Sequence, residues 1–391
     1  MTKINFKNLF LTILLISLSI AGFSQVPVFI YHAHPNFGFL QSDFAQQMDF
    51  LVNNDYQTAT MDQLYDWMVN DQPLPYRPVV LTFDDNYIRV YTEVYPVLAA
   101  RGLTAVNYAH SSYVGVGGSN DHCDWIEICE MESNGAVLTE SHTKTHANLA
   151  AVSLVTAQEE IEGSKSDIET NISGKTCNHI AYPYGGYNSD VIDLCSDAGY
   201  LTAVTTENNY VYRDTPLFQL GRLGGDGISL TSFKTKCKFY DLPSNPPETG
   251  WVIDNGEANF KIYGTGTFNA DTQTGYYGDD YCIINPGDGQ NSARWAAYLK
   301  ESGSFRIWAR WTAHQNRTSQ AEYVIHHSSG QSSVTVDQTQ NGSEWRKLGT
   351  FYFDEGDPVM VYLHDSTDGY AVADGVWFEP VESLVKGWQL Y

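Results

Sequence analysis

Basic residues are scarce in this sequence. Its 391 residues include 22 lysines and arginines against 46 aspartates and glutamates, a formal net charge of −24 at pH 7. Removing the first 24 residues, which carry Lys3 and Lys7 and no acid, would take two positive charges away and leave −26. Nucleic acids and anionic lipid surfaces attract positively charged proteins, so we predict no nucleic-acid partner. A neutral or cationic polymer suits such a protein better than a sulfated or uronate one.

Long apolar runs are absent after the first two dozen residues, so the sequence predicts no membrane insertion. The N-terminus has two lysines, an apolar run from Leu9 to Ile20, and small residues at Gly22 and Ser24, the two positions that a signal peptidase reads. That run is shorter than the ~20 residues of a bilayer-spanning helix, and its layout is that of a cleavable secretory signal. We therefore expect a signal peptide over residues 1–24 and a secreted or periplasmic mature protein.

Closely spaced cysteine pairs are also missing, which argues against a cysteine-based zinc site. The six cysteines are spread from Cys123 to Cys282. An exported protein can oxidise its thiols, and the local pairs would then be Cys123 with Cys129 and Cys177 with Cys195. The alternative is six free or purely structural thiols.

Residues 26–240 alternate short apolar runs with helical patterns. Runs typical of buried strands lie at 26–31, 79–83, 104–109, 136–139, 180–182 and 201–205. Phe44, Met48 and Leu51 recur at helical spacing, and Thr156 with Glu159 predicts a capping box that opens a later helix. Strands that alternate with helices indicate an α/β fold with a parallel sheet, here with enough strands to curl into a barrel. Chemistry in such folds gathers at the carboxyl ends of the strands.

The remainder of the chain differs in kind. Residues 241–250 hold three prolines and predict a linker. Residues 251–391 contain short alternating runs separated by glycine and asparagine, which are typical of an all-β sandwich.

Two adjacent carboxylates, Asp84 and Asp85, end one of the predicted strands. Adjacent acids repel each other, and a nearby cation would offset that repulsion. A solvated turn is the alternative explanation, because Asp is common in turns. His142 and His146 follow another strand, and two imidazoles four residues apart can direct ring nitrogens at one ion. One carboxylate with two imidazoles leaves coordination positions open, as a hydrolytic metal requires.

A rigid turn, Ala181-Tyr-Pro-Tyr-Gly-Gly186, follows a third strand. Proline and glycine fix its shape, and backbone N–H groups in such a turn can hold an oxyanion.

In this order the three stretches resemble the polysaccharide deacetylases of carbohydrate esterase family 4, in the branch acting on exopolysaccharide amino sugars. The resemblance spans about residues 26–235 and includes VPVFIYH, PVVLTFDD, GAVLTESHTKTH, IAYPYGGYN and AGYLTAVTTE. It implies a distorted (β/α) barrel. Asp85, His142 and His146 would bind a divalent metal, most often Zn²⁺. Asp84 would be the base that takes a proton from the attacking water, and the backbone N–H of Tyr184 would help to stabilise the oxyanion.

Three features depart from the family pattern. Asn86 stands where the family usually has glycine, and Ala181 stands where many members have an arginine that orients the base. The late leucine–histidine motif, the usual source of the general acid, is not visible before residue 241. Arg222, in FQLGRLGGDG, could supply the missing positive charge. Our candidate for the general acid is His32, with His34 second; the alternative is that His32 only packs or hydrogen-bonds at the barrel mouth.

Residues 251–380 resemble the golvesin C-terminal-like sandwiches, on the features GYYGDDY, FRIWARW, YVIHHSSG and VADGVWFE. Exposed Trp and Tyr there could stack on sugar rings. We favour the alternative, that strand aromatics at alternating positions fill the sandwich core.

The sequence thus predicts a secreted, metal-dependent deacetylase that removes N-acetyl groups from amino sugars in a polysaccharide or oligosaccharide. The competing hypotheses are an O-acetyl esterase acting on a hemicellulose such as acetylxylan, and a non-catalytic glycan-binding protein on the same fold. The expected partner is an acetylated carbohydrate, and the sequence makes no prediction of the oligomeric state.

Overall fold

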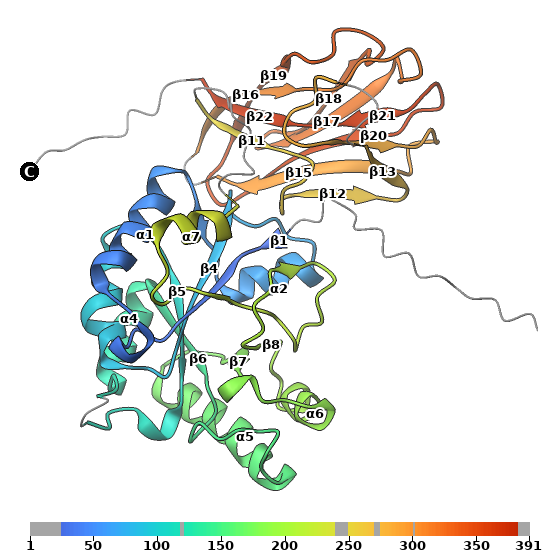
Figure 1. Cartoon of the computed structure of the whole chain (residues 1–391). Helices are drawn as coiled ribbons and strands as arrows, with labels where there is room; N and C mark the ends of the chain where they lie inside the picture. Colours follow the sequence, from blue (N-terminus) through green and yellow to red (C-terminus); the bar gives the residue numbers. More distant parts are fainter. Residues whose placement is uncertain (1–24, 118–120, 239–248, 270–273, 300–301, 382–391) are drawn as a thin grey trace, which may run out of the picture.

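The computed structural model describes residues 25–117, 121–238, 249–269, 274–299 and 302–381. The predicted signal peptide at 1–24 and most of the predicted linker at 241–250 lie outside these residues. Figure 1 shows a mixed helix-and-strand region, coloured blue to yellow-green, below an all-strand region coloured yellow to red. The predicted fold class, an α/β barrel-like sheet followed by an all-β region, is confirmed.

A curled parallel sheet is the framework of the first region. Its strands are β2 (Val28–Tyr31), β3 (Gln57–Thr58), β4 (Pro78–Asp84), β5 (Ala105–Ala109), β6 (Val137–Ser141), β7 (His179–Ala181), β8 (Thr202–Val204) and β10 (Leu223–Gly224). The order is β10-β2-β4-β5-β6-β7-β8, and β3 pairs with the start of β4. A separate antiparallel pair joins β1 (Gln25–Val26) to β9 (Val211–Tyr212).

Seven α-helices cover this sheet in the described part of the chain. They are α1 (Gln41–Asn53), α2 (Met61–Val69), α3 (Tyr95–Ala99), α4 (Trp125–Asn134), α5 (Leu154–Asn171), α6 (Ser189–Asp197) and α7 (Leu230–Lys236). The predicted capping box was wrong, because Ser153 caps α5 by accepting the N–H of Thr156, which therefore lies inside the helix. Among the described residues, no helix has the length and apolar character needed to span a bilayer.

The segment 217–224 links the two edges of the curled sheet. On one side it pairs with β8, where the N–H of Leu220 donates to Ala203 and the N–H of Thr205 donates to Leu220. On the other side its last residues form β10, which runs parallel to β2 with Leu223 opposite Phe29. Short strands at both edges thus bring the ends of the sheet together, with Arg222 at the junction.

Side-chain alternation along β4 decides which residues face the barrel interior. Leu81 and Phe83 pack outward into the cluster that contains α1, whereas Val80 packs into a separate cluster that also contains Val106 of β5. Because successive residues point to opposite faces, Asp84 continues the inward face of Val80. A single carboxylate is therefore delivered to the carboxyl mouth of the barrel by a strand whose other residues are apolar except for Thr82.

The second region is built from antiparallel sheets. Its strands are β11 (Trp251–Ile253), β12 (Phe260–Tyr263), β13 (Gly266–Asn269), β14 (Tyr281–Ile284), β15 (Ser292–Tyr298), β16 (Gly303–Ala309), β17 (Ala321–His327), β18 (Gly330–Val336), β19 (Arg346–Phe353), β20 (Pro358–His364), β21 (Ala371–Ala373) and β22 (Val376–Pro380). The inward aromatics Trp295, Tyr323 and Phe305 are buried, as expected for core residues. Trp308 and Trp377, on the other face of β16 and β22, are half-buried and stack on each other with ring centroids 5.4 Å apart.

The two regions contact each other through residues 67–77, from the last turn of α2 to the start of β4. The indole N–H of Trp67 donates to the carbonyl of Ala258 over 2.8 Å. The amide of Asn259 accepts the N–H of Leu74 and donates to the carbonyls of Leu74 and Pro75. These contacts lie where β4 begins, at the end of the barrel opposite to Asp84.

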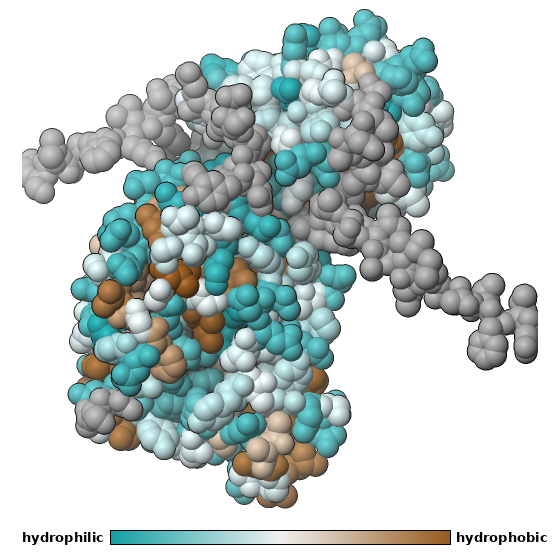
Figure 2. All heavy atoms as spheres, in the orientation of Figure 1, coloured by the Kyte–Doolittle hydropathy of each residue, from teal (hydrophilic) through white to brown (hydrophobic). Residues whose placement is uncertain are grey.

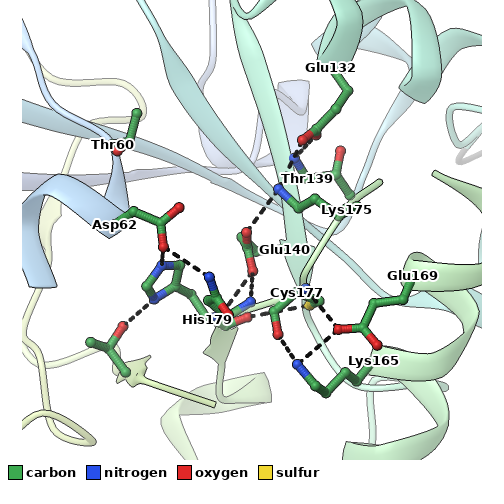
Figure 3. Close-up of polar contacts among 12 residues, drawn as sticks. Thr60, Asp62, Glu132, Thr139, Glu140, Lys165, Glu169, Lys175, Cys177 and His179 are labelled. Carbon is green, nitrogen blue, oxygen red and sulfur yellow. Dashed lines mark hydrogen bonds and ion pairs between the residues drawn. The ribbon is translucent and has the colours of Figure 1, made fainter. Parts of the chain in front are cut away.

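A buried polar network fastens β6 and β7 to the surrounding helices (Figure 3). Glu140 of β6 accepts the backbone N–H groups of Asn178 and His179, each over 2.8 Å. The ammonium of Lys175 lies between Glu140 and Glu132, 3.0 and 2.9 Å from their carboxylates. The imidazole of His179 continues the network outward to Asp62 of α2.

Lys175→Met should destabilise the protein, because it leaves the buried carboxylate of Glu140 without its cation. Loss of one partner from a buried ion pair costs about 3 kcal/mol or more, and the midpoint of urea unfolding would report it. The double variant Lys175→Met/Glu140→Gln removes both charges and should recover part of that stability. Equal stability of Lys175→Met and the wild type would contradict this role of the network.

All six cysteines are described, and all six are free thiols, so the structure forms neither of the predicted local pairs. Burial raises the pKa of Cys123 and of Cys195 to about 12. Such thiols stay protonated at neutral pH and pack as small apolar groups.

Candidate active site

Asp85, His142 and His146 present one oxygen and two nitrogens to a common point. A carboxylate oxygen of Asp85 lies 3.5 Å from Nε2 of His142 and 3.2 Å from Nε2 of His146. The three ligand atoms all lie within 4.8 Å of one another. Asp85 follows β4 and the histidines follow β6, so the carboxyl ends of two strands bring together side chains that are far apart in the sequence.

The orientation of His142 is set by a hydrogen bond from its other ring nitrogen. Nδ1 lies 2.8 Å from the carbonyl oxygen of Ala181, so Nδ1 carries the proton and Nε2 turns its lone pair toward Asp85. Burial lowers the pKa of His142 and keeps the ring neutral, the form that binds metal ions. One oxygen with two imidazole nitrogens suits Zn²⁺ and leaves room for further ligands. The residues present therefore fit a divalent ion.

Asp84 is held by Arg222 in a two-pronged ion pair. Nη1 and Nη2 of Arg222 donate to the two carboxylate oxygens of Asp84 over 2.6 and 2.7 Å. Burial raises the pKa of Asp84, but the charge and the hydrogen bonds of the Arg222 guanidinium outweigh it and hold that pKa below the usual range. Asp84 is thus ionised beside the metal-ligand group, 3.9 Å from Nε2 of His142. The prediction that Arg222 supplies the positive charge missing at position 181 is confirmed.

Arg222 itself is nearly inaccessible, with 1% of its surface exposed. Its Nε donates to the carbonyl of Thr205 at the end of β8, and Nη1 also donates to the hydroxyl of Thr82 in β4. The guanidinium is therefore held from the end of β8 and from β4.

The backbone takes the left-handed conformation at several residues of the site. Asp85, Asn86 and His146 have φ values of 73°, 54° and 62°. This conformation is costly for most residues, and asparagine tolerates it best after glycine. The side chain of Asn86 also accepts from Asn107 and donates to the carbonyl of Cys123. Asn86 can therefore adopt the left-handed turn at the position where the family usually has glycine.

His32 forms a close pair with Asp226. Its Nδ1 lies 3.0 Å from Oδ2 of Asp226, and the same oxygen accepts the backbone N–H of His32 over 2.8 Å. Burial alone would lower the pKa of His32, but the hydrogen bond to Asp226 and the charges of Asp84 and Asp85 raise it overall. His34, the second candidate, instead accepts the N–H of Asn36 and caps the short turn that follows.

Tyr184 stands at the edge of the site, with its ring edge-on to that of His146 and the centroids 4.7 Å apart. Its side chain is largely exposed, and its φ of 59° belongs to the left-handed region. The turn predicted at 181–186 thus reaches the metal-ligand group, as an oxyanion donor must.

Sequence reasoning missed Asp226 and His110. Asp226 follows β10 by two residues, and His110 follows β5 directly. Both are therefore polar residues just after the carboxyl end of a strand, the same position that marked the predicted site residues. The ring of His110 is 5.7 Å from that of His146, and burial lowers the pKa of His110 to about 3. Its Nδ1 is buried and has no hydrogen-bond partner among the described residues.

Comparison with known proteins gives two family matches. Residues 71–203 match the polysaccharide deacetylase family, and residues 251–380 match the golvesin C-terminal domain family. The Bacillus subtilis protein YxkH, named as a polysaccharide deacetylase, is 29% identical over 214 residues, which cover 54% of this chain and 75% of that protein. A poly-beta-1,6-N-acetyl-D-glucosamine N-deacetylase of Staphylococcus aureus is 26% identical over 218 residues, which cover 53% of this chain and 73% of that protein.

A solved structure supports the fold. The Streptococcus pyogenes deacetylase PplD, in complex with acetate, superposes with a TM-score of 0.51 at 22% identity, over 55% of this chain and 99% of that one. The two family matches identify a polysaccharide deacetylase domain, matched over residues 71–203, and a golvesin C-terminal domain, matched over residues 251–380.

Proposed function

We propose that this chain is a secreted, metal-dependent deacetylase that removes N-acetyl groups from amino sugars in a polysaccharide or oligosaccharide. One observation carries the proposal. An ionised carboxylate, Asp84, and an imidazole–carboxylate pair, His32 with Asp226, lie at the same barrel mouth as the group Asp85, His142 and His146. A base, an acid and a set of metal ligands are the parts that amide hydrolysis requires.

Asp85, His142 and His146 would hold the ion, and Zn²⁺ is the ion we propose. When bound, such an ion lowers the pKa of a water to ~7 and polarises the acetyl carbonyl. Asp84 accepts the proton of the attacking water. Arg222 keeps the Asp84 carboxylate ionised and fixes its orientation. The backbone N–H of Tyr184 donates to the oxygen that becomes negative in the tetrahedral state.

The N-acetyl preference rests on the leaving group. An amine leaves a tetrahedral carbon only when its nitrogen has gained a proton, whereas an alkoxide from an ester leaves more readily. His32, whose pKa is raised chiefly by its hydrogen bond to Asp226, is suited to donate that proton. The Staphylococcus aureus relative, named for N-deacetylation, supports the same choice.

Asp226→Asn tests the role of the pair. Removal of the carboxylate should lower the pKa of His32, because the hydrogen bond and the charge of Asp226 that raise it are lost. A general acid works only while protonated, so the alkaline limb of the pH profile of kcat should move to lower pH. The profile should be measured on an N-acetylated oligosaccharide. An unmoved alkaline limb in Asp226→Asn and full activity in His32→Ala would both contradict this assignment.

The function itself is tested by acetate release from a panel of glycans, with purified protein supplied with Zn²⁺ or Co²⁺. Acetate from N-acetylchitooligosaccharides supports amide hydrolysis, and acetate only from acetylxylan supports the esterase. Glycan retention without acetate supports a non-catalytic binding protein. Chelation should abolish release and added Zn²⁺ should restore it; full activity in metal-free protein would contradict the metal dependence.

A further inference from the structure

Three aspartates of the golvesin domain come together around the turn that joins β21 to β22. Asp254 directly follows β11, Asp280 directly precedes β14, and Asp374 lies in the turn itself. Because β11 pairs with β22 and β14 pairs with β21, both strands bring their aspartate to this turn. We call Asp254, Asp280 and Asp374 the aspartate cluster.

The backbone of residues 277–278 shows how closely two of these carboxylates approach each other. Both oxygens of Asp374 accept the N–H of Tyr277, over 3.0 and 3.2 Å. Oδ2 of Asp254 lies against the next residue, Gly278, where any Cβ atom would clash with it. The two carboxylates therefore contact neighbouring units of one backbone segment. Burial and the charge of Asp374 raise the pKa of Asp254 well above its usual range.

Burial sets the aspartate cluster apart from most polar side chains of the golvesin domain. The visible surface of that domain in Figure 2 is mostly teal and white, as expected when polar side chains face solvent. Asp280 and Asp374 are instead 7% and 0% exposed, and Asp254 is half-buried. Buried carboxylates are rare unless a cation or a metal ion compensates their charge.

The protein supplies little positive charge to the aspartate cluster. Within the described ranges, none of the three aspartates forms a salt bridge with a lysine, arginine or histidine. The charge of Arg310 acts on Asp374, but its guanidinium donates its hydrogen bonds to the carbonyl of Gly275. Three carboxylates thus face at most one partial counter-charge.

The amide of Asn255 points into the aspartate cluster and has an unpaired oxygen. Asn255 is 0% exposed, and its Nδ2 donates to a carboxylate oxygen of Asp280. Its Oδ1 is also buried and has no hydrogen-bond partner in the described part of the chain. A buried acceptor without a partner costs free energy. A cation would satisfy this oxygen and the carboxylates together, whereas a water molecule would leave the negative charge uncompensated.

The ligand atoms favour one kind of cation. Carboxylate and amide oxygens bind hard cations, whereas protein sites for Zn²⁺ are built mainly from cysteine and histidine. Ca²⁺ accepts about six to eight oxygens in a flexible arrangement, while Mg²⁺ demands near-ideal octahedral geometry and keeps several of its waters. Buried oxygens from three separate segments therefore suit Ca²⁺ better than Mg²⁺.

The spacing of the carboxylates limits how many of them bind the ion directly. Among the described residues, Asp85, His142 and His146 are the one group of three acidic, histidine or cysteine side chains whose ligand atoms all lie within 4.8 Å of one another. The carboxylates of the aspartate cluster are therefore spaced more widely, as their mutual repulsion favours. Two of them, with the amide oxygen, main-chain carbonyls and water, are enough to begin a Ca²⁺ shell.

We propose that Asp254, Asp374 and the amide oxygen of Asn255 bind one Ca²⁺ ion in the golvesin domain, and that Asp280 is drawn in as a further ligand. This site lies in a different domain from the metal-ligand group of the barrel. The proposal does not depend on the reaction that the barrel catalyses.

A Ca²⁺ ion at this place would also affect the contact between the two regions. Residues 254–259 connect β11 to β12, and the last two of them, Ala258 and Asn259, form hydrogen bonds with the barrel. An ion held by Asp254 and Asn255 would fix this segment at its start. Ca²⁺ should therefore stabilise the sandwich and its attachment to the barrel together.

Calcium binding by the full-length protein is the first test. Equilibrium dialysis with radioactive Ca²⁺ should give one saturable site per chain in the wild type, and none in Asp254→Asn or Asp374→Asn. Each amide keeps an oxygen for the backbone N–H that the carboxylate now accepts, so both variants should fold. Asp279→Asn, at the exposed neighbour of Asp280, is the matched control and should keep the site. His142→Ala should keep it too, because the barrel ligands are not involved.

Thermal unfolding gives the second measurement. Ca²⁺ at a hundred times its Kd should raise the ratio of folded to unfolded protein about a hundredfold, which corresponds to a Tm increase of roughly 5–10 °C. Without calcium, Asp254→Asn should be at least as stable as the wild type, because its repulsion with Asp374 is lost. Added Ca²⁺ should not change the Tm of this variant.

The outcomes separate an ion from a proton as the neutralising partner. If the aspartate cluster is neutralised by protons alone, the wild type will bind no Ca²⁺ and its Tm will not respond, and the proposal is wrong. Undiminished binding in both Asp254→Asn and Asp374→Asn would place the ion elsewhere. An equal Tm increase with Mg²⁺ at the same concentration would contradict the choice of Ca²⁺.

Discussion

Asp84→Asn is expected to lower kcat for acetate release by about 10²- to 10⁴-fold, the range for loss of a general base. The amide is nearly the size of the carboxylate but accepts no proton at neutral pH. Asp85, His142 and His146 are untouched, so the variant should keep its divalent ion. Acetate release and the metal content of the same sample are the two measurements. A variant that retains both its metal and its activity would show that another group is the base.

The variant needs a control for stability, because Arg222 loses its anionic partner. With 1% of its surface exposed, the guanidinium would be buried without a counter-charge, which is destabilising. Asp84→Asn/Arg222→Met removes both charges and should recover stability without recovering activity. Asp43→Asn, an exposed carboxylate in the first turn of α1, should change neither property. If the double variant regained activity, misfolding rather than loss of the base would explain the defect of the single variant.

Position relative to strand ends explains which parts of the site could be predicted. Asp84 and Asp85 close an apolar run, and His142 with His146 follows another, so the parallel sheet brings them together by its topology alone. His110 follows β5 in the same way but stands alone in the sequence, without a second ligand at metal-binding spacing. A lone histidine is more often structural, and only its distance from His146 shows that it belongs to the site.

The contacts across the junction of the barrel could not be predicted in the same way. Segment 217–224 has only a two-residue strand, β10, which gives no periodic pattern to read. The partner of Arg222 could be suggested only because family members carry an arginine elsewhere. Asp226 lies among glycines in a stretch that resembles any surface turn, and its pairing with His32 spans 194 positions in the sequence. Long-range polar pairs depend on the closed sheet, which local patterns do not specify.

The contacts between the two regions could likewise not be predicted from local sequence patterns. Trp67 of α2 is buried and its indole N–H reaches across to Ala258, a contact that no local sequence pattern indicates. The proline-rich stretch at 241–250 predicts a linker, yet the two regions share hydrogen bonds through residues 67–77. A linker pattern describes the covalent connection and gives no information about contacts made elsewhere.

Deletion of the golvesin domain, by ending the chain at residue 250, should strongly destabilise the deacetylase barrel. Three backbone groups at Leu74 and Pro75 would lose the partner they have in Asn259, at about 1 kcal/mol or more each. The indole N–H of Trp67 would also lose its acceptor at Ala258, at a further cost of about 1 kcal/mol or more. These losses together approach the lower end of the 5–15 kcal/mol that usually stabilises a domain. The shortened chain should therefore have a much lower Tm and a lower yield of soluble, metal-loaded protein.

Asn259→Ala tests the same interface in the full chain. Loss of its amide should cost about 2–3 kcal/mol, seen as a lower midpoint of urea unfolding for the barrel, whose signal can be followed by metal release. Gln331→Ala, an exposed polar residue of β18 in the same region, is the matched control and should be neutral. Because the interface lies opposite to Asp84, the activity of folded Asn259→Ala should equal that of the wild type. A shortened chain with the Tm of the full-length protein, together with a neutral Asn259→Ala, would mean that the contacts at residues 67–77 contribute no stability.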